Sequence, residues 1–582
     1  MKKYNYLLLL SAVTAATAFT SCDEDKLDIP QKGVASIEDF YKTDDDAESA
    51  LVTVYADTYD NFAFMGDVTG WNYSPYLGLI NWMGDDLILA GSDEGDCVGE
   101  RELHDFRYTT SNSVVQAGYT LFYRSIHKCN LLLNNMADLS SPVIDRCKAE
   151  ARVMRAFDHM MLGIYWGTPP IVTEVLTGAS QPENCESQEY LMQWVADECD
   201  AALPYLEERK DVNDKDGCYK ITKGFANAVK GKALMWKKDY SGAKAAFEQV
   251  INSNKYALVP SEDMCKIGHC NGKGSPEIVF EFNVVGSTTV NNLGNRQMGN
   301  FPYTFNWRFE FLGDGPKADK RLNNSGWGWI NPDKKWAEDL IANDGLESAR
   351  RKAWILTYDE LLYNIVWPSD GNFADYDDVA TNFVPGRTDA KATDKGRGVS
   401  KEYYGNGGYF CWRTVMHEKG DNLNFNWCGT WNANFTIMRY AEVLLLYAEA
   451  CAQLGETSGK GLEVLNMIQN RAKSAHVSSS LSLAEVKNEK RFEMWQDGCR
   501  FADLVRWNDL ETLKTADHVI YILDDALRLG QASEHKAVVK VDAGSTFKSK
   551  GAGFQVGKHE LLPFPQTVVD LNKALKQNPG WE

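Results

Sequence analysis

The sequence predicts a mainly α-helical protein, in which helix pairs of the tetratricopeptide type form a right-handed superhelical scaffold with large loop-rich insertions and few short strands. Three observations favour this fold class. Apolar residues recur at helical spacing in several separate segments, and one pair of adjacent helical segments has the small and aromatic residues of a tetratricopeptide repeat. The segments between the pairs are rich in Gly, Asn, Asp and aromatic residues, with few helical periods.

The clearest helix is predicted between Glu150 and Gly167. Its apolar residues recur at intervals of three and four, which places one stripe on a single face; they are Val153, Ala156, Phe157, Met160, Met161 and Ile164. We expect this helix to end at Gly167, before Pro169 and Pro170.

Two adjacent helices are predicted between Thr222 and Ser253. Gly231, Ala243 and Phe247 follow the small, small, aromatic spacing of a tetratricopeptide repeat, in which small residues let the helices approach and the aromatic ring fills the gap beside them. The match is partial, because the proline expected near position 255 is absent. A second pair is predicted over Met438–Leu454 and Gly461–Ala475, and further helices around Gln116–Met136 and Ser187–Leu206.

Long ordered loops and short strands are predicted for residues 61–110 and 268–436. Within them, Glu277–Phe282 alternates with a period of two and predicts an isolated strand. We expect a single compact domain over residues 36–582, with helix pairs mainly within 116–260 and 432–510.

The N-terminus has the pattern of a lipoprotein signal peptide over residues 1–21. A positive start is followed by a short apolar stretch and then by Phe19-Thr20-Ser21-Cys22, where cleavage would leave Cys22 as the lipidated first residue. Residues 22–35 would form a lipidated acidic tether. Its acidic run, Asp23–Asp28, is either a solvated tether or a sorting signal.

Composition excludes several classes of function. With 61 Lys and Arg against 81 Asp and Glu, the formal net charge of -20 would repel phosphate backbones, so we expect no nucleic-acid partner. Of the 13 cysteines, none lies in a C-x-x-C pair, and the chain is too long for a small disulfide scaffold. Cys265 and Cys270 are the pair in which a disulfide would be tested first.

Six segments in order resemble the SusD/RagB family of outer-membrane nutrient-binding lipoproteins. They are Glu150–Phe157 running to Gly167–Pro170, Ile221–Gly224, Gly326–Gly328 with Asn331-Pro332, Arg439–Leu445, Asp503–Trp507 and Gln577–Trp581. Glu489–Arg491 and Gln496–Gly498 only approximate the family pattern, which puts local salt bridges in doubt. The resemblance implies a SusD-like fold and a Cys22-anchored protein on the outer face of the outer membrane. It also implies a SusC-like TonB-dependent transporter as partner, and capture of oligosaccharides or, in some members, peptides.

Three loop clusters supply the flat rings and polar groups that a glycan site needs. The first has Trp71, Tyr73, Tyr76, Trp82 and Arg101, the second has Trp307, Arg308, Asn323 and Trp329, and the third spans Asn424–Trp431. Trp82, Trp307 and Trp329 are the strongest candidates. The alternative is that these aromatic residues form the core of the loop region, as we expect for Trp327.

Charged residues elsewhere have structural interpretations. Arg439, Glu442 and Glu449, and likewise Asp503 and Arg506, are expected to form ion pairs between helices. An acidic cluster could hold a structural calcium ion, and consists of Asp85, Asp86, Asp93, Glu94 and Asp96. No other cofactor is expected.

The function predicted from the sequence is capture of an extracellular glycan and its delivery to the transporter, without catalysis. No hydrolase, metalloprotease or nucleotide-binding motif is present. A glycoside hydrolase remains an alternative, since two well-placed carboxylates would suffice. Two more functions are compatible with the sequence: a peptide-capturing member of the family, and a partner-docking subunit with no soluble ligand.

Overall fold

The structure is a computed structural model of the chain. It describes residues 40–63, 74–89, 98–285, 330–357, 409–414, 420–421, 432–516, 521–523, 539–541 and 553–582. The predicted signal peptide, Cys22 and the acidic tether lie outside the described residues, so those predictions stay predictions.

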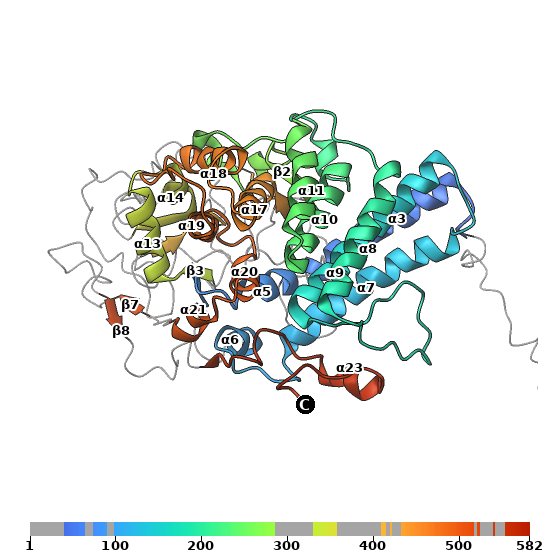
Figure 1. Cartoon of the computed structure of the whole chain (residues 1–582). Helices are drawn as coiled ribbons and strands as arrows, with labels where there is room; N and C mark the ends of the chain where they lie inside the picture. Colours follow the sequence, from blue (N-terminus) through green and yellow to red (C-terminus); the bar gives the residue numbers. More distant parts are fainter. Residues whose placement is uncertain are drawn as a thin grey trace, which may run out of the picture.

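Long helices packed side by side form the main body of the molecule (Figure 1). Each packs against the next along the chain, and α17 also contacts α19. In order they are α3 (Asp44–Ala63), α7 (Ser113–Asn135), α8 (Pro142–Trp166), α9 (Gln188–Ala202), α10 (Lys223–Lys237), α11 (Tyr240–Asn252), α17 (Tyr440–Gln453), α18 (Lys460–Arg471) and α19 (Leu483–Glu493). The mainly helical, repeat-type fold predicted from the sequence is confirmed.

Local signals in the sequence set the ends of these helices. The side chain of Asn112 accepts hydrogen bonds from the first backbone amides of α7, and Ser141 and Ser187 do the same for α8 and α9. Helix α8 ends at Gly167, whose φ of 72° is a conformation that glycine adopts at little cost. The predicted end of this helix is therefore confirmed.

The α10–α11 pair has the close contact that its spacing predicts. Phe247 is fully buried and lies over Gly231, so that a Cβ atom at Gly231 would be only 2.5 Å from Cε1 of the ring. Glycine at this position therefore lets the two helices approach, and the aromatic ring fills the space between them.

Short antiparallel strand pairs join distant parts of the described chain. Strand β1 (Leu87–Leu89) pairs with β3 (Ile330–Pro332), β2 (Ile278–Phe282) with β6 (Phe435–Arg439), β4 (Ile355–Thr357) with β5 (Tyr409–Cys411), and β7 (Tyr521–Leu523) with β8 (Val539–Val541). The strand predicted at 277–282 is present as β2. All five residues of β2 are buried, including Glu281, because the chain covers both of its faces.

The predicted loop regions contain helices that were not predicted from the sequence. They are α5 (Pro75–Asn81), α6 (Val98–His104), α13 (Lys334–Asp344) and α14 (Ala349–Trp354). Every residue of α5 is buried, so this helix has no polar face and no amphipathic pattern.

The C-terminal segment closes over the N-terminal helices, after α20 (Arg500–Arg506) and α21 (Leu510–Thr515) and with α23 (Gln566–Leu571) within it (Figure 1). The indole of Trp166 donates a hydrogen bond to the carbonyl of Pro563 at 2.9 Å, and Asn578 Nδ2 donates to the carbonyl of Trp166 at 3.0 Å. Trp581 stacks on Tyr108 with 5.1 Å between ring centroids. The two ends of the sequence thus share one core.

Buried ion pairs connect the C-terminal half. The Arg439 guanidinium bonds to Glu277 at 2.5 Å, Glu493 at 3.1 Å and Asp497 at 2.5 Å, and Arg471 bonds to the same two glutamates. Burial opposes ionisation of Asp497, but Arg413 and Arg439 outweigh it and lower its pKa to about 2. The segments Glu489–Arg491 and Gln496–Gly498, which only approximate the family pattern, therefore do form salt bridges.

The ion pairs predicted between helices are present. Glu442 binds Lys232 of α10 at 2.8 Å, and Glu449 binds Arg506 of α20 at 2.5 Å. Arg439 differs from Glu442 and Glu449 in its position, because it is the last residue of strand β6 and does not belong to helix α17.

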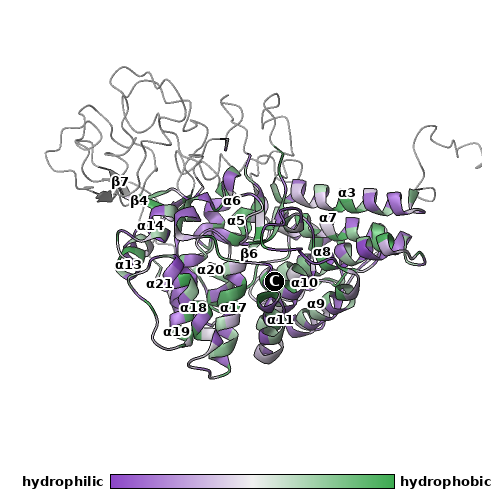
Figure 2. Cartoon of the chain, turned by 90° about the horizontal axis from the view of Figure 1, so that it is seen from above, coloured by the Kyte–Doolittle hydropathy of each residue, from purple (hydrophilic) through white to green (hydrophobic). Residues whose placement is uncertain are grey.

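Hydrophobic and hydrophilic residues alternate along the helices (Figure 2). In the described part of the chain, no helix combines the length and the apolar character required to cross a bilayer.

Candidate functional site

The predicted ligand clusters are attached to the scaffold through the strand pairs. In the β1–β3 pair, Leu89 lies opposite Ile330. The aromatic residues of the first cluster precede Leu89 in the sequence, Arg101 follows it, and the second cluster ends at Trp329, the residue before Ile330. One short sheet therefore joins the segments that carry the two clusters.

The second strand pair connects the other two clusters. Phe282 lies opposite Phe435 in the β2–β6 pair, and the backbone amide of Val284 donates a hydrogen bond to Asn434 Oδ1 at 2.9 Å. Lys273 Nζ reaches both the Val284 carbonyl at 2.6 Å and Asn432 Oδ1 at 3.0 Å. The start of the second cluster's segment is thereby fixed beside the end of the third.

An aromatic core lies beneath these attachment points. The ring of Tyr76 stacks on Phe62 with 4.3 Å between centroids and contacts Phe435 at 5.8 Å, while Phe62 contacts Phe282 at 6.1 Å. Tyr76 is only 4% exposed, and its burial raises the pKa of its hydroxyl. Tyr76 is therefore placed as a packing residue, not at a surface that a ligand could reach.

Trp82 and Arg101 are also buried, at 1% and 3% exposure. The indole of Trp82 folds back on its own helix, where a Cβ at Gly78 would be 2.6 Å from Nε1. A ring in this position presents no face to a sugar. These placements follow the alternative interpretation, in which loop aromatics build a core.

The other candidates lie outside the described residues, and their ligand contacts stay predictions. They are Trp71, Tyr73, Trp307, Arg308, Asn323 and Trp329.

The structure describes part of the candidate calcium cluster and both cysteines of the candidate disulfide. Both oxygens of Asp85 are bound by Arg500, at 2.5 Å and 3.0 Å, so this carboxylate serves an ion pair. Asp93, Glu94 and Asp96 lie outside the described residues, and the described part contains no group of three metal-ligating side chains. Cys265 and Cys270 carry thiols, and no disulfide joins them.

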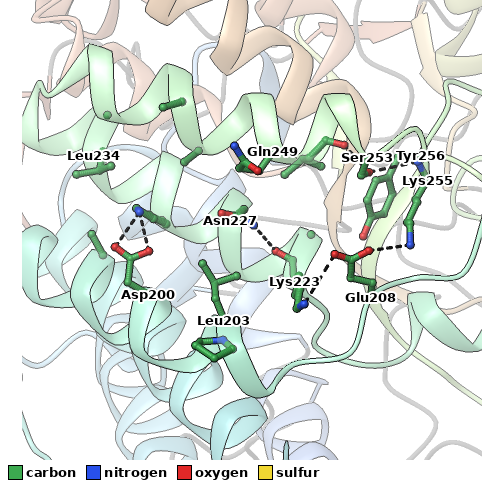
Figure 3. A pocket seen from close by; sticks show the side chains of 18 of the residues that line it. Asp200, Leu203, Glu208, Lys223, Asn227, Leu234, Gln249, Ser253, Lys255 and Tyr256 are labelled. Carbon is green, nitrogen blue, oxygen red and sulfur yellow. Dashed lines mark hydrogen bonds and ion pairs between the residues drawn. The ribbon is translucent and has the colours of Figure 1, made fainter.

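A wide groove of about 770 Å³ runs along α10 between α9 and α11 (Figure 3). Two ion pairs lie along it: Lys230 with Asp200 at 2.6 Å, and Lys255 with Glu208 at 2.8 Å. Lys223 lies 3.9 Å from Glu208. Sequence patterns missed this groove because its walls come from three helices, and its paired charges are typical of contacts between repeat helices.

Comparison with known proteins identifies the family. The model of the SusD family matches residues 276–581, more than half of the chain, and the protein belongs to this family. The SusD-like protein P2 of Formosa agariphila is 23% identical, with 100% of both chains covered. A SusD-like protein of Bacteroides ovatus is 22% identical over 86% of this chain and 82% of the relative.

Solved structures share the fold. Surface glycan-binding protein A from Bacteroides thetaiotaomicron, solved in complex with laminarihexaose, superposes with a TM-score of 0.66 and 20% identity, covering 92% of this chain and 100% of the other. A laminarin binding SusD-like protein superposes with a TM-score of 0.65 and 20% identity, covering 93% and 100%. At such low identity the likeness establishes the fold alone.

Proposed function

We propose that this protein is a cell-surface lipoprotein that binds an extracellular oligosaccharide and delivers it, unchanged, to a TonB-dependent transporter of the outer membrane. Membership of the SusD family carries this proposal. Two solved structures of the same fold are described as binding laminarihexaose and laminarin, which favours a glycan over a peptide as ligand.

The proposed site is the loop region attached at β1–β3 and β2–β6. Trp307 and Trp329 supply flat rings for the apolar C–H faces of a sugar, and Arg308 and Asn323 supply hydrogen bonds to its hydroxyls. The strand pairs and the Lys273 contacts fix the ends of the segment that carries all four residues. Trp71 and Tyr73 would extend the same surface, because their segment joins helix α5 beneath it.

The anchor and the partner belong to the same proposal. Cys22 follows a signal-peptide pattern and would carry the lipid chains that hold the protein at the membrane. The acidic residues after it would then separate the folded domain from the bilayer.

The test is titration calorimetry of the wild-type protein and of Trp307→Ala and Trp329→Ala against a panel of neutral oligosaccharides. We expect at least one neutral glycan to bind, and each substitution to weaken it about tenfold, or about 1.4 kcal/mol. Tyr190→Ala is the matched control, because Tyr190 is 51% exposed on α9, away from the proposed site. Unchanged affinity in both tryptophan variants would contradict the site.

Two further outcomes would replace the proposal itself. Binding of a peptide pool where no glycan binds would favour a peptide-capturing function. New reducing ends after incubation with polysaccharide would show a glycoside hydrolase.

A further inference from the structure

A second cavity, of about 520 Å³, lies where the ends of α7 and α9 meet the first half of α8. These three helices lie side by side in the scaffold (Figure 1). The cavity shares no lining residue with the groove of Figure 3. Its walls combine small apolar residues with cationic side chains and an exposed ring, and the residues used below are Lys148, Ala149, Arg152, Arg155, Ala202 and Tyr205.

Arg152 is the cation best placed to meet a ligand. Its side chain is 37% exposed, and its nearest carboxylate oxygen, Glu198 Oε1, is 3.6 Å from Nη1, which is longer than a hydrogen bond. The other oxygen of Glu198 accepts a hydrogen bond of 2.7 Å from Arg155 Nη2. Arg155 thus holds Glu198 in place, while the guanidinium of Arg152 keeps donors for another acceptor.

Arg155 adds positive charge beneath the cavity. The residue is 5% exposed, and its Nε atom is buried without a hydrogen-bond partner in the part of the chain that the structure describes. Lys148, Arg152 and Arg155 outnumber the neighbouring carboxylates, Asp145 and Glu198, by one charge. This local excess stands out in a protein whose net charge is -20. It favours an anionic group at this place.

Tyr205 indicates what kind of molecule carries the anion. Its side chain lines the cavity and is 55% exposed, which is unusual for a large aromatic residue. A phenol ring stacks on the apolar C–H face of a sugar, and a guanidinium binds a carboxylate through two parallel hydrogen bonds. Lys230 and Lys255 of the α9–α11 groove, by contrast, are already paired at 2.6 and 2.8 Å.

We propose that this cavity binds a carboxylate-bearing sugar unit, a uronate, of an extracellular glycan. Arg152 binds the carboxylate, Tyr205 stacks on the sugar ring, and Arg155 positions Glu198 so that Arg152 remains available. The proposal extends the proposed function by adding a second, acidic-sugar site on the helical scaffold. It rests on that function only in taking a glycan as ligand.

The experiment is titration calorimetry of the full-length protein with trigalacturonate and with its methyl ester, which has the same shape but no charge. We expect the free acid to bind and the ester to bind at least tenfold more weakly. Arg152→Ala and Tyr205→Ala should each weaken acid binding tenfold or more, and Arg152→Lys should lose most of it because an ammonium cannot bind a carboxylate through two bonds in one plane. Tyr190→Ala, at a similarly exposed ring outside the cavity, should bind as the wild type does.

The outcomes separate this inference from the proposed function. If Trp329→Ala loses neutral glycans but keeps trigalacturonate, both sites are supported and independent. If no neutral glycan binds but trigalacturonate binding depends on Arg152, the loop site fails and the cavity stands. Absence of trigalacturonate binding, equal binding of the ester, or wild-type affinity in a folded Arg152→Ala protein would overturn the inference. Competition by millimolar acetate or sulfate alone would show a general anion site, which would also overturn it.

Discussion

The absence of a side chain at Gly231 sets the distance between helices α10 and α11. Gly231 faces Phe247, and the ring occupies the space in which any other side chain would begin. Alanine is intrinsically better in a helix than glycine by about 0.5–1 kcal/mol. Forcing a methyl group into a filled core costs about 1–3 kcal/mol. Because Phe247 is fully buried, its ring has little room to move, and the steric cost outweighs the gain.

Gly231→Ala should therefore destabilise the protein by about 1–2 kcal/mol, seen as a lower Tm in scanning calorimetry. Gly178→Ala is the matched control, since nothing lies within 4 Å of a Cβ at that glycine. It should leave the Tm nearly unchanged. A Gly231→Ala protein as stable as the wild type would show that the α10–α11 contact can relax.

Individual residues also show what the sequence could predict. The spacing of Gly231, Ala243 and Phe247 is local, so it identified a contact between neighbouring helices correctly. Local spacing could not decide the exposure of Trp82, which is 1% in the folded protein. A loop rich in aromatic residues predicts either a binding surface or a core, and only the tertiary structure decides between them.

Among the elements, strand pair β2–β6 contains a buried acid. Glu281 Oε1 accepts hydrogen bonds of 2.7 Å from the amide of Gly274 and from Asn434 Nδ2. Burial raises the pKa of its carboxyl group to about 7, although these hydrogen bonds and Lys273 oppose the rise. The protonated acid is therefore favoured in the folded state at pH values where the unfolded chain is ionised.

Glu281 should make stability depend on pH between about 4.5 and 7. Its contribution is fully present below the unfolded pKa of about 4.5 and is lost as the pH rises through about 7, a loss of about 3 kcal/mol. Glu281→Gln keeps an acceptor for both hydrogen bonds and cannot ionise, so it should flatten this part of the stability profile and raise the Tm at pH 8.

The control for this profile is Glu338→Gln, at a glutamate whose side chain is 52% exposed beside Lys334. It should retain the wild-type slope. The same slope in Glu281→Gln would assign the pH dependence to other groups.

Helices were predictable where apolar residues recur at helical spacing over several turns. Helices α8, α10 and α17 have such spacing, and the sequence identified all three. Helix α5 is short and buried on every side, so it has no polar face that periodicity could identify.

At the scale of the whole molecule, buried ion pairs hold together segments far apart in the sequence. Arg439 binds Glu277 at the start of β2, Glu493 at the end of α19, and Asp497 beyond it. Removing the guanidinium would leave two buried carboxylates, Glu277 and Glu493, and the partly buried Asp497 short of a partner. Breaking a buried pair in this way costs about 3–5 kcal/mol.

Arg439→Met should therefore lower the Tm strongly in scanning calorimetry and reduce the yield of folded protein. Lys335→Met removes an exposed ion pair with Asp339, in which the side chain of Lys335 is 78% exposed. This substitution should lower the free energy of unfolding by less than about 1 kcal/mol. Similar Tm values for the two variants would mean that the buried network contributes little.

The places where loop segments leave the scaffold and rejoin it lie side by side, and this has an evolutionary consequence. Thr357 and Tyr409 face each other across β4–β5, Leu523 and Val539 across β7–β8, and the Ser74 amide bonds to the Ala63 carbonyl at 2.9 Å. Each intervening stretch therefore departs and returns one strand width apart, whatever its length, and lengthening a closed loop costs little additional entropy. Proteins that descend from such a chain can exchange these stretches for longer, shorter or unrelated ones. They can thereby change what they bind while the helical scaffold stays the same.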